Sequence, residues 1–198
     1  MNTKIKSSRK VVKKRERIKE FLTESEMEKF LRASKLTRNP KRDYCLMLMA
    51  YRHGLRVSEA IDIRLSQLDL DGAYLYVRRL KGSRSGQQPI EGDELRAIRA
   101  WLHERELHKM ATSDHLFLSE QGPFVRQTIN YLVKVMGQKA GFGFRVYPHM
   151  LRHSCGFALA NKNTATRTIQ EALGHENIQN TVKYTASNPE RLRGIWRK

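Results

Sequence analysis

Arginine, histidine and tyrosine occur in this chain at spacings that would let them act together on one phosphate group. In the first such segment, Arg56 follows Gly54 and precedes Glu59 by three residues. A planar guanidinium can bind two phosphate oxygens at once, and a nearby carboxylate can hold that guanidinium in place. From this segment alone, an ordinary surface ion pair between Arg56 and Glu59 is the simpler interpretation.

A second segment begins at Pro148, which is well suited to the first turn of a helix. The i, i+3 and i+4 spacing then places His149, Arg152 and His153 on one helix face. A histidine beside an arginine can exchange protons next to an anion that the arginine binds. The alternative is a mixed polar patch, and we expect His153 to be a structural hydrogen-bonding residue because apolar residues follow it.

A third segment contains Gly174, which we expect to end a helix and to leave His175 exposed. Tyr184 follows nine residues later in a short polar helix. A lone tyrosine is usually a core or interface residue. Beside two arginines and two histidines, however, Tyr184 becomes a candidate nucleophile toward phosphorus.

A fourth segment is a glycine-rich turn that contains Lys81. A lysine at that position can give a proton to a leaving oxygen, although from this segment alone a role in keeping the hairpin soluble is the better interpretation. The acidic residues are scattered and form no pattern typical of a Mg²⁺ site. Cationic side chains around one phosphate are therefore expected to supply the electrostatic stabilisation that a metal would otherwise give.

The elements that must position these residues are mostly helical. Apolar periodicity and end signals such as the Thr23–Glu26 capping box predict helices at 24–34, 40–54, 58–63 (with Ser58 as the cap), 91–108, 125–139, 149–161, 166–173, 181–185 and 189–197. Two strands are expected at 74–79 and 87–90, around a turn at 82–86. The predicted fold class is mainly α with a small antiparallel β-sheet.

Charge restricts the class of partner. The 198 residues contain 38 Lys and Arg against 20 Asp and Glu, a formal net charge of +18. Such an excess favours nucleic acid as the partner, with an anionic membrane surface second. No apolar run reaches the roughly 18 residues of a membrane span, and no signal peptide is recognisable, so a cytoplasmic location is expected. Cys45 and Cys155 are expected to be buried thiols.

Residues 1–20 are predicted to be a flexible basic arm, with nine Lys and Arg against two Glu. The arm is either a solvated tail or a segment that lies along phosphates. The expected DNA contacts are four residues of this arm and three arginines of the hairpin: Lys10, Lys13, Lys14, Arg15, Arg78, Arg79 and Arg84.

The order of the candidate residues along the chain is more specific than any one of them. Arg56, Lys81, His149 with Arg152, Gly174–His175 and Tyr184 together resemble the catalytic domain of the tyrosine recombinase (phage integrase) family. The resemblance runs from about Phe21 to Trp196, so residues 21–198 are expected to form that domain. Three phrases are similar to the short recombinases that invert fimbrial promoter segments: 42–46, 148–156 and 184–188.

This resemblance implies a role for each residue. Arg56 and Arg152 would hold the scissile phosphate, and Tyr184 would form a 3′-phosphotyrosyl bond. Lys81 would protonate the leaving 5′-oxygen, His149 would act as general acid and base, and His175 would hydrogen-bond the phosphate. Glu59 would support Arg56 and His149.

The same resemblance implies no metal or ATP as cofactor, and double-stranded DNA with inverted-repeat sites as the substrate. It further implies a homotetramer on synapsed DNA, linked through the 189–197 helix, and DNA-bending accessory proteins. Most family members carry a further N-terminal domain, whereas only about twenty residues precede the catalytic domain here. A type IB topoisomerase and a non-catalytic DNA-binding regulator with the same fold are the alternatives.

Overall fold

Eight α-helices and two small antiparallel sheets make up the part of the chain that the structure, a computed structural model, describes: residues 19–80 and 83–186. The helices are α1 (Glu24–Ser34), α2 (Pro40–Arg52), α3 (Val57–Ile61), α4 (Gly92–Glu106), α5 (Arg126–Lys139), α6 (Pro148–Asn161), α7 (Thr166–Leu173) and α8 (Gln179–Thr185). The strands are β1 (Leu68–Asp69), β2 (Tyr74–Val77), β3 (Gly86–Pro89), β4 (Leu118–Ser119) and β5 (Gly122–Pro123), and a 3₁₀ turn spans Leu65–Gln67. The predicted fold class is confirmed.

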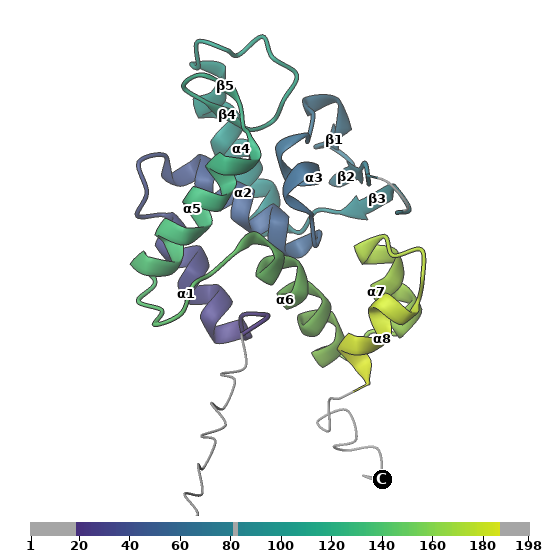
Figure 1. Cartoon of the computed structure of the whole chain (residues 1–198). Helices are drawn as coiled ribbons and strands as arrows, with labels where there is room; N and C mark the ends of the chain where they lie inside the picture. The colour runs from purple at the N-terminus through teal and green to yellow at the C-terminus, as the bar shows by residue number, and fades with distance from the viewer. Residues whose placement is uncertain (1–18, 81–82, 187–198) are drawn as a thin grey trace, which may run out of the picture.

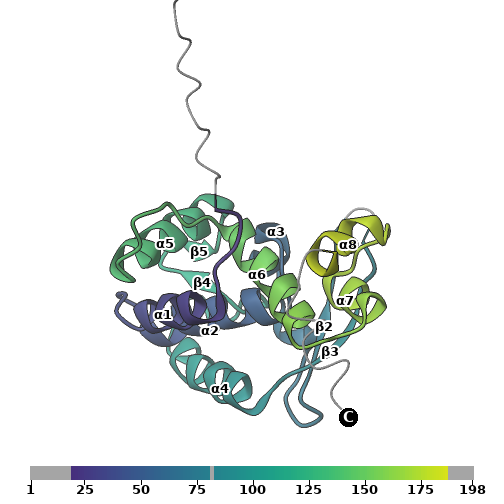
Figure 2. The ribbon, with the colours of Figure 1, turned by 90° about the horizontal axis from the view of Figure 1, so that it is seen from below.

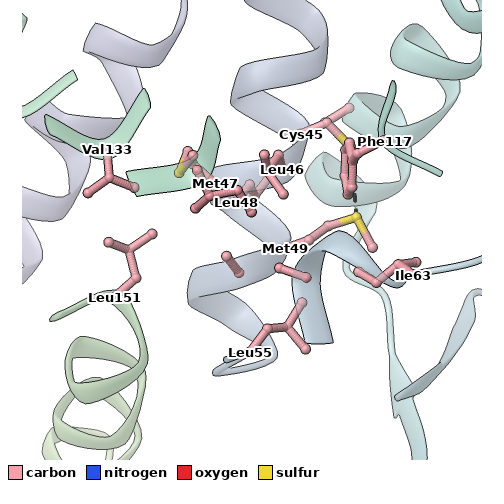
Figure 3. Packing of buried hydrophobic residues seen from close by; sticks show 14 of the residues in the cluster. Cys45, Leu46, Met47, Leu48, Met49, Leu55, Ile63, Phe117, Val133 and Leu151 are labelled. Atoms are coloured by element: carbon pink, nitrogen blue, oxygen red, sulfur yellow. Dashed lines mark hydrogen bonds between the residues drawn. The ribbon is translucent and has the colours of Figure 1, made fainter. Parts of the chain in front are cut away.

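Helix α2 is the centre of the main core, because residues 45–50 are buried on every side of it. It packs against α1, α4 and α6, the helices that surround it in Figures 1 and 2. Figure 3 shows its Leu46, Met47 and Met49 among apolar side chains of other elements, including Phe117 and Leu151. A helix apolar all round is expected in such a position. The buried state predicted for both cysteines is confirmed.

A second, smaller cluster lies where α7 and α8 pack on α6. Its buried members are Cys155, Ala160, Ile169, Leu173 and Tyr184. Figures 1 and 2 both show α7 and α8 on the opposite side of α6 from α1 and α5, with α7 beside the β2–β3 hairpin. The candidate nucleophile therefore belongs to a small subdomain that packs on α6 and is hydrogen-bonded to the β2–β3 hairpin.

The three-stranded sheet has the order β1–β2–β3, and β2 pairs with β3 antiparallel from Tyr74↔Pro89 to Val77↔Gly86. The expected hairpin is confirmed: β2 ends two residues earlier than the pattern predicted, and β3 has the predicted length but begins one residue earlier. Leu75 and Val77 face the core while their neighbours face outward, as the period of two requires. The β4–β5 pair was not predicted, because two-residue strands leave no alternation to detect.

Most helix ends follow their sequence signals, including the Thr23–Glu26 capping box. The start of α3 differs from the expectation, because Ser58 lies inside the helix and Arg56 is its N-cap residue. The carboxylate of Glu59 accepts the Arg56 backbone N–H at 2.9 Å, which moves the helix start towards Arg56.

Some expectations fall on parts of the chain outside the described residues. These are the basic arm with Lys10, Lys13, Lys14 and Arg15, the candidate general acid Lys81, and the 189–197 helix. None of the described helices is long and apolar enough to cross a membrane.

Candidate active site

Five of the six predicted catalytic residues lie on elements that meet beside the β2–β3 hairpin. Arg56 caps α3, His149 and Arg152 lie in the first turns of α6, His175 follows α7, and Tyr184 is in α8. Arg56 and Arg152 both lie within 4.0 Å of Glu59. The ring of His175 is 6.4 Å from that of Tyr184, and the ring of His149 is 5.8 Å from that of His153, centroid to centroid. The structure thus brings together residues separated by more than a hundred positions in the sequence.

Glu59 is the carboxylate that organises the arginines. Its Oε1 accepts from Arg56 Nη1 at 2.7 Å, and its Oε2 accepts from Arg79 Nη1 at 2.7 Å. Arg152 Nη1 lies 4.0 Å from the same Oε2. Burial alone would raise the pKa of Glu59, but the charge of Arg79 and the hydrogen bonds from Arg56 and Arg79 outweigh it and lower that pKa. Glu59 therefore stays ionised at neutral pH.

The predicted support of Arg56 by Glu59 matches this geometry, whereas the support of His149 does not. Within the described part of the chain, Glu59 has no hydrogen bond to His149; its second oxygen is used by Arg79 instead. Arg79 follows β2 two residues after its end, and its buried guanidinium lies against the Glu59 oxygen that Arg56 leaves free.

Arg79 was expected to contact DNA, and its position corrects that expectation. Its side chain is 1% exposed and donates to the backbone oxygens of His53, Gly54 and Ala172 as well as to Glu59. A guanidinium with these partners has no free face for a phosphate. The sequence already indicated that Arg79 faces inward. Every second side chain of a strand lies on the same face, and Arg79 continues the row of the buried Leu75 and Val77.

We predict that Arg79→Ala lowers the free energy of unfolding by about 3 kcal/mol or more, because it removes the main partner of a buried carboxylate. Arg78 is the matched control: its side chain is 57% exposed and pairs with Asp62. Arg78→Ala should change that free energy by less than about 1 kcal/mol. Urea unfolding of both variants measures the difference, and equal small losses would contradict a structural role for Arg79.

Arg152 is buried and fixed by the backbone. Nη1 donates to Gly54 O, and Nη2 donates to Leu173 O at 2.7 Å, so it joins the end of α2 to the end of α7. Burial, with the charges of Arg56 and Arg79, lowers the pKa of Arg152 to about 10. Three guanidiniums thus share one carboxylate in a partly desolvated site. This excess of positive charge favours an anion at the site.

The two predicted catalytic histidines differ in burial. His149 is exposed, and partial desolvation followed by the charges of Arg152 and Arg56 lowers its pKa. His175 was expected to be exposed but is only 9% exposed, because α8 packs over it. Its Nδ1 lies 2.9 Å from Thr181 Oγ1, and burial with the charge of Arg152 lowers its pKa to about 4. Both rings are therefore neutral at neutral pH.

Tyr184 is 2% exposed. Its hydroxyl lies 2.9 Å from Nδ1 of His153, and its ring meets Phe157 edge-on with centroids 5.1 Å apart. Burial raises the pKa of Tyr184 to about 12, so the phenol keeps its proton at neutral pH. The contact with His153 could not be predicted from the sequence, because it joins α6 to α8.

The ring of Tyr184 also lies directly on Gly156. A Cβ atom at position 156 would be 2.7 Å from Cζ of the ring, too close for any real contact. Only a glycine in α6 therefore lets the tyrosine ring pack so closely.

We predict that Gly156→Ala displaces Tyr184, destabilises the fold by about 1–3 kcal/mol and slows any reaction of its hydroxyl. Gly143 is the matched control, because an added Cβ there meets no atom within 4 Å. Thermal unfolding and reaction rates of Gly156→Ala and Gly143→Ala measure the effect. Wild-type rates in Gly156→Ala would contradict the close packing.

Two of the remaining arginines lie on the surface of the hairpin region. Arg78 pairs with Asp62, and Arg84 is exposed while its backbone N–H donates to Gly174 O at 3.2 Å. This backbone contact joins the hairpin to the end of α7. Both side chains are placed where a phosphate outside the molecule could reach them.

Comparison with known proteins agrees with this architecture. Residues 20–191 match the Phage integrase family, and the chain belongs to that family of tyrosine recombinases. It is 45% identical over 177 residues to the type 1 fimbriae regulatory protein FimB of Escherichia coli K12, covering 89% of this chain and 88% of that protein. It is 41% identical over 180 residues to FimE of the same strain, covering 90% and 91%.

Solved structures show the same fold. The crystal structure of XerA recombinase superposes with a TM-score of 0.78 at 28% identity, over 90% of this chain and 64% of that one. The XerH recombinase bound to its palindromic difH substrate in a post-cleavage complex gives 0.76 at 25% identity, over 90% and 53%. The chain therefore spans most of the fimbrial regulators but less than two thirds of these Xer proteins.

Proposed function

We propose that this protein is a site-specific recombinase that cleaves and rejoins duplex DNA and inverts a fimbrial promoter segment between inverted repeats. The observation that carries the proposal is the site itself: Arg56, Arg79 and Arg152 share the single carboxylate of Glu59. A scissile phosphodiester supplies the missing negative charge. The similarity to FimB and FimE over about nine tenths of the chain supports the fimbrial substrate.

The residues act on the phosphate as follows. Arg56 and Arg152 bind its non-bridging oxygens and stabilise the charge that builds up in the transition state. The hydroxyl of Tyr184 attacks phosphorus, and the 5′-oxygen leaves with a proton from Lys81. His149 serves as general acid and base, and His175 donates a hydrogen bond to the phosphate. Because the phosphotyrosyl bond keeps the energy of the broken bond, rejoining needs no ATP.

Exchange between two sites requires four strand cleavages, and we propose that four protomers assemble on two synapsed repeats. The XerH complex with its palindromic DNA site is consistent with a DNA partner. DNA-bending accessory proteins would bring the repeats together. A further basic contribution comes from the arm, whose nine Lys and Arg would add sequence-independent contacts to phosphates.

A plasmid inversion assay tests the proposal. Its substrate is a supercoiled plasmid that carries inverted repeats from beside the coding region. We expect the purified protein to invert the segment between them, as seen in the restriction pattern. Relaxation of supercoils without inversion would instead indicate a topoisomerase. DNA binding with neither reaction would indicate a regulator without catalytic activity.

A further inference from the structure

His153 follows Arg152 directly and has no part in the proposed cleavage mechanism, yet it contacts the atom that must react. Its Nδ1 lies 2.9 Å from the Tyr184 hydroxyl oxygen, and the two ring centroids are 5.9 Å apart. Among the described residues, that hydroxyl makes no other hydrogen bond. His175 only stacks on the Tyr184 ring, with centroids 6.4 Å apart, and its Nδ1 is hydrogen-bonded to Thr181.

We infer that His153 is a catalytic residue that accepts the phenolic proton of Tyr184 when its oxygen attacks phosphorus. On this proton His153 takes the base role assigned above to His149, which has no hydrogen bond to that hydroxyl among the described residues. The inference rests on the proposed function, because it concerns the same cleavage step. In that step the Tyr184 Oη–P bond forms, the P–O5′ bond breaks, and the phenolic proton moves to His153 Nδ1. The 5′-oxygen receives its proton from Lys81. In the rejoining step a 5′-hydroxyl attacks phosphorus and gives its proton to Lys81, the P–O5′ bond forms, the Tyr184 Oη–P bond breaks, and His153 returns the proton to the Tyr184 oxygen.

The protonation states in the structure suit this direction of transfer. Burial, followed by the charges of Lys183, His149 and Arg152, lowers the pKa of His153 to about 4. The ring is therefore neutral at neutral pH, and a neutral Nδ1 can accept a hydrogen bond. Tyr184 keeps its proton under the same conditions. The hydrogen bond thus runs from the phenol to the imidazole, as an attacking hydroxyl requires.

The weak basicity of His153 in the free protein does not prevent the transfer. As the O–P bond forms, the phenolic oxygen loses electron density and its proton becomes much more acidic. The phosphate of DNA also brings negative charge close to Arg152 and Lys183, which offsets two of the three charges that lower the pKa of His153. His153 therefore becomes a better acceptor at the moment of attack.

Other ionisable groups around the pair must be considered in any pH experiment. Those that face His153 or Tyr184 are His149, Arg152 and Cys155 on α6, Lys183 on α8, His175 before α8, and Glu20 before α1. Burial and neighbouring positive charges lower the pKa of His149 below its ordinary 6.5 and that of His175 to about 4, so both rings stay neutral across the range of the experiment, about pH 6.5 to about pH 9. Burial raises the pKa of the Cys155 thiol to about 12, which removes that group from the range.

The experiment measures covalent adduct formation on a nicked duplex whose scissile phosphate carries a 5′-bridging sulfur. A thiolate leaves without a proton, so the rate reports removal of the Tyr184 proton and is independent of Lys81. The variants are His153→Ala and His153→Asn, since an asparagine oxygen can replace Nδ1 as an acceptor but cannot take up the proton. His103→Ala, at an exposed position of α4, is the control.

We expect the wild-type and His103→Ala rates to change little between about pH 6.5 and about pH 9. The His153→Ala rate should be about 10²-fold lower or more near neutral pH. It should also rise about tenfold per pH unit, because hydroxide must then remove the proton of a phenol with a pKa of about 12. His153→Asn should react faster than His153→Ala but with the same steep pH dependence.

If the reaction rate of His153→Ala did not change with pH, the inference would be wrong, whatever the size of that rate. A wild-type rate and a wild-type pH profile in His153→Asn would also contradict the inference, because they would show that His153 only positions Tyr184. Asparagine should preserve the fold if alanine does not, so the test does not depend on one variant. Failure of the wild-type protein to form any adduct would instead refute the proposed function, which keeps the two failures distinguishable.

Discussion

Replacing Tyr184 by phenylalanine is expected to abolish covalent capture of DNA and inversion while DNA affinity stays within about twofold of wild type. Phenylalanine keeps the ring that packs against Gly156 and Phe157 and removes only the hydroxyl. The lost hydrogen bond to His153 should cost about 1 kcal/mol of stability, too little to unfold the domain. Gel mobility shifts measure binding, and an SDS-resistant adduct assay measures capture.

Tyr131→Phe is the matched control for this change, because Tyr131 is an exposed tyrosine of α5 outside the site. It should retain wild-type capture and inversion. An adduct of normal yield in Tyr184→Phe would show that another residue attacks phosphorus.

Replacing Arg56 by alanine is expected to lower the cleavage rate by about 10²-fold or more, with little change in DNA affinity. Arg56 is the best of the clustered arginines for this test because its side chain is 31% exposed and Glu59 keeps Arg79 as a partner. Arg56→Lys should recover only part of the rate, since an ammonium cannot form the bidentate contact of a guanidinium.

Arg38→Ala is the control for Arg56→Ala. Arg38 is 82% exposed and pairs with Glu120 on the surface. Single-turnover cleavage rates and dissociation constants should be measured for all three variants at one salt concentration. A change confined to the dissociation constant of Arg56→Ala would contradict its role in the transition state.

The helices and the hairpin could be predicted because their signals are local. Thr23 with Glu26, Pro40 and Gly174 each act within a few residues of a helix end, and the structure places those ends there. The predicted cap at Ser58 is wrong because the signals that set the start of α3 are also local. Both Arg56 and Ser58 could act as the N-cap residue of this helix. The carboxylate of Glu59 accepts the backbone N–H of Arg56, so the helix begins after Arg56.

Burial in the site was less predictable, because it depends on segments far apart in the sequence. His175 is covered by α8, which holds Thr181 and Tyr184, and a glycine at a helix end gives no sign of that cover. Arg79 is the exception, since the alternation along β2 is a local signal that puts its side chain in the inward-facing row. Its partners could not be predicted, because they come from α3 and from the ends of α2 and α7.

The most direct test of the account is the identity of the residue that becomes linked to DNA. A duplex nicked beside the cleavage position of the inverted repeat traps the intermediate, because the short strand that bears the 5′-hydroxyl diffuses away. Proteolysis and mass spectrometry of the trapped product then locate the nucleotide. We predict a single 3′-phosphotyrosyl linkage at Tyr184. An adduct at any other residue, or no adduct on a duplex that the protein binds, would contradict the account.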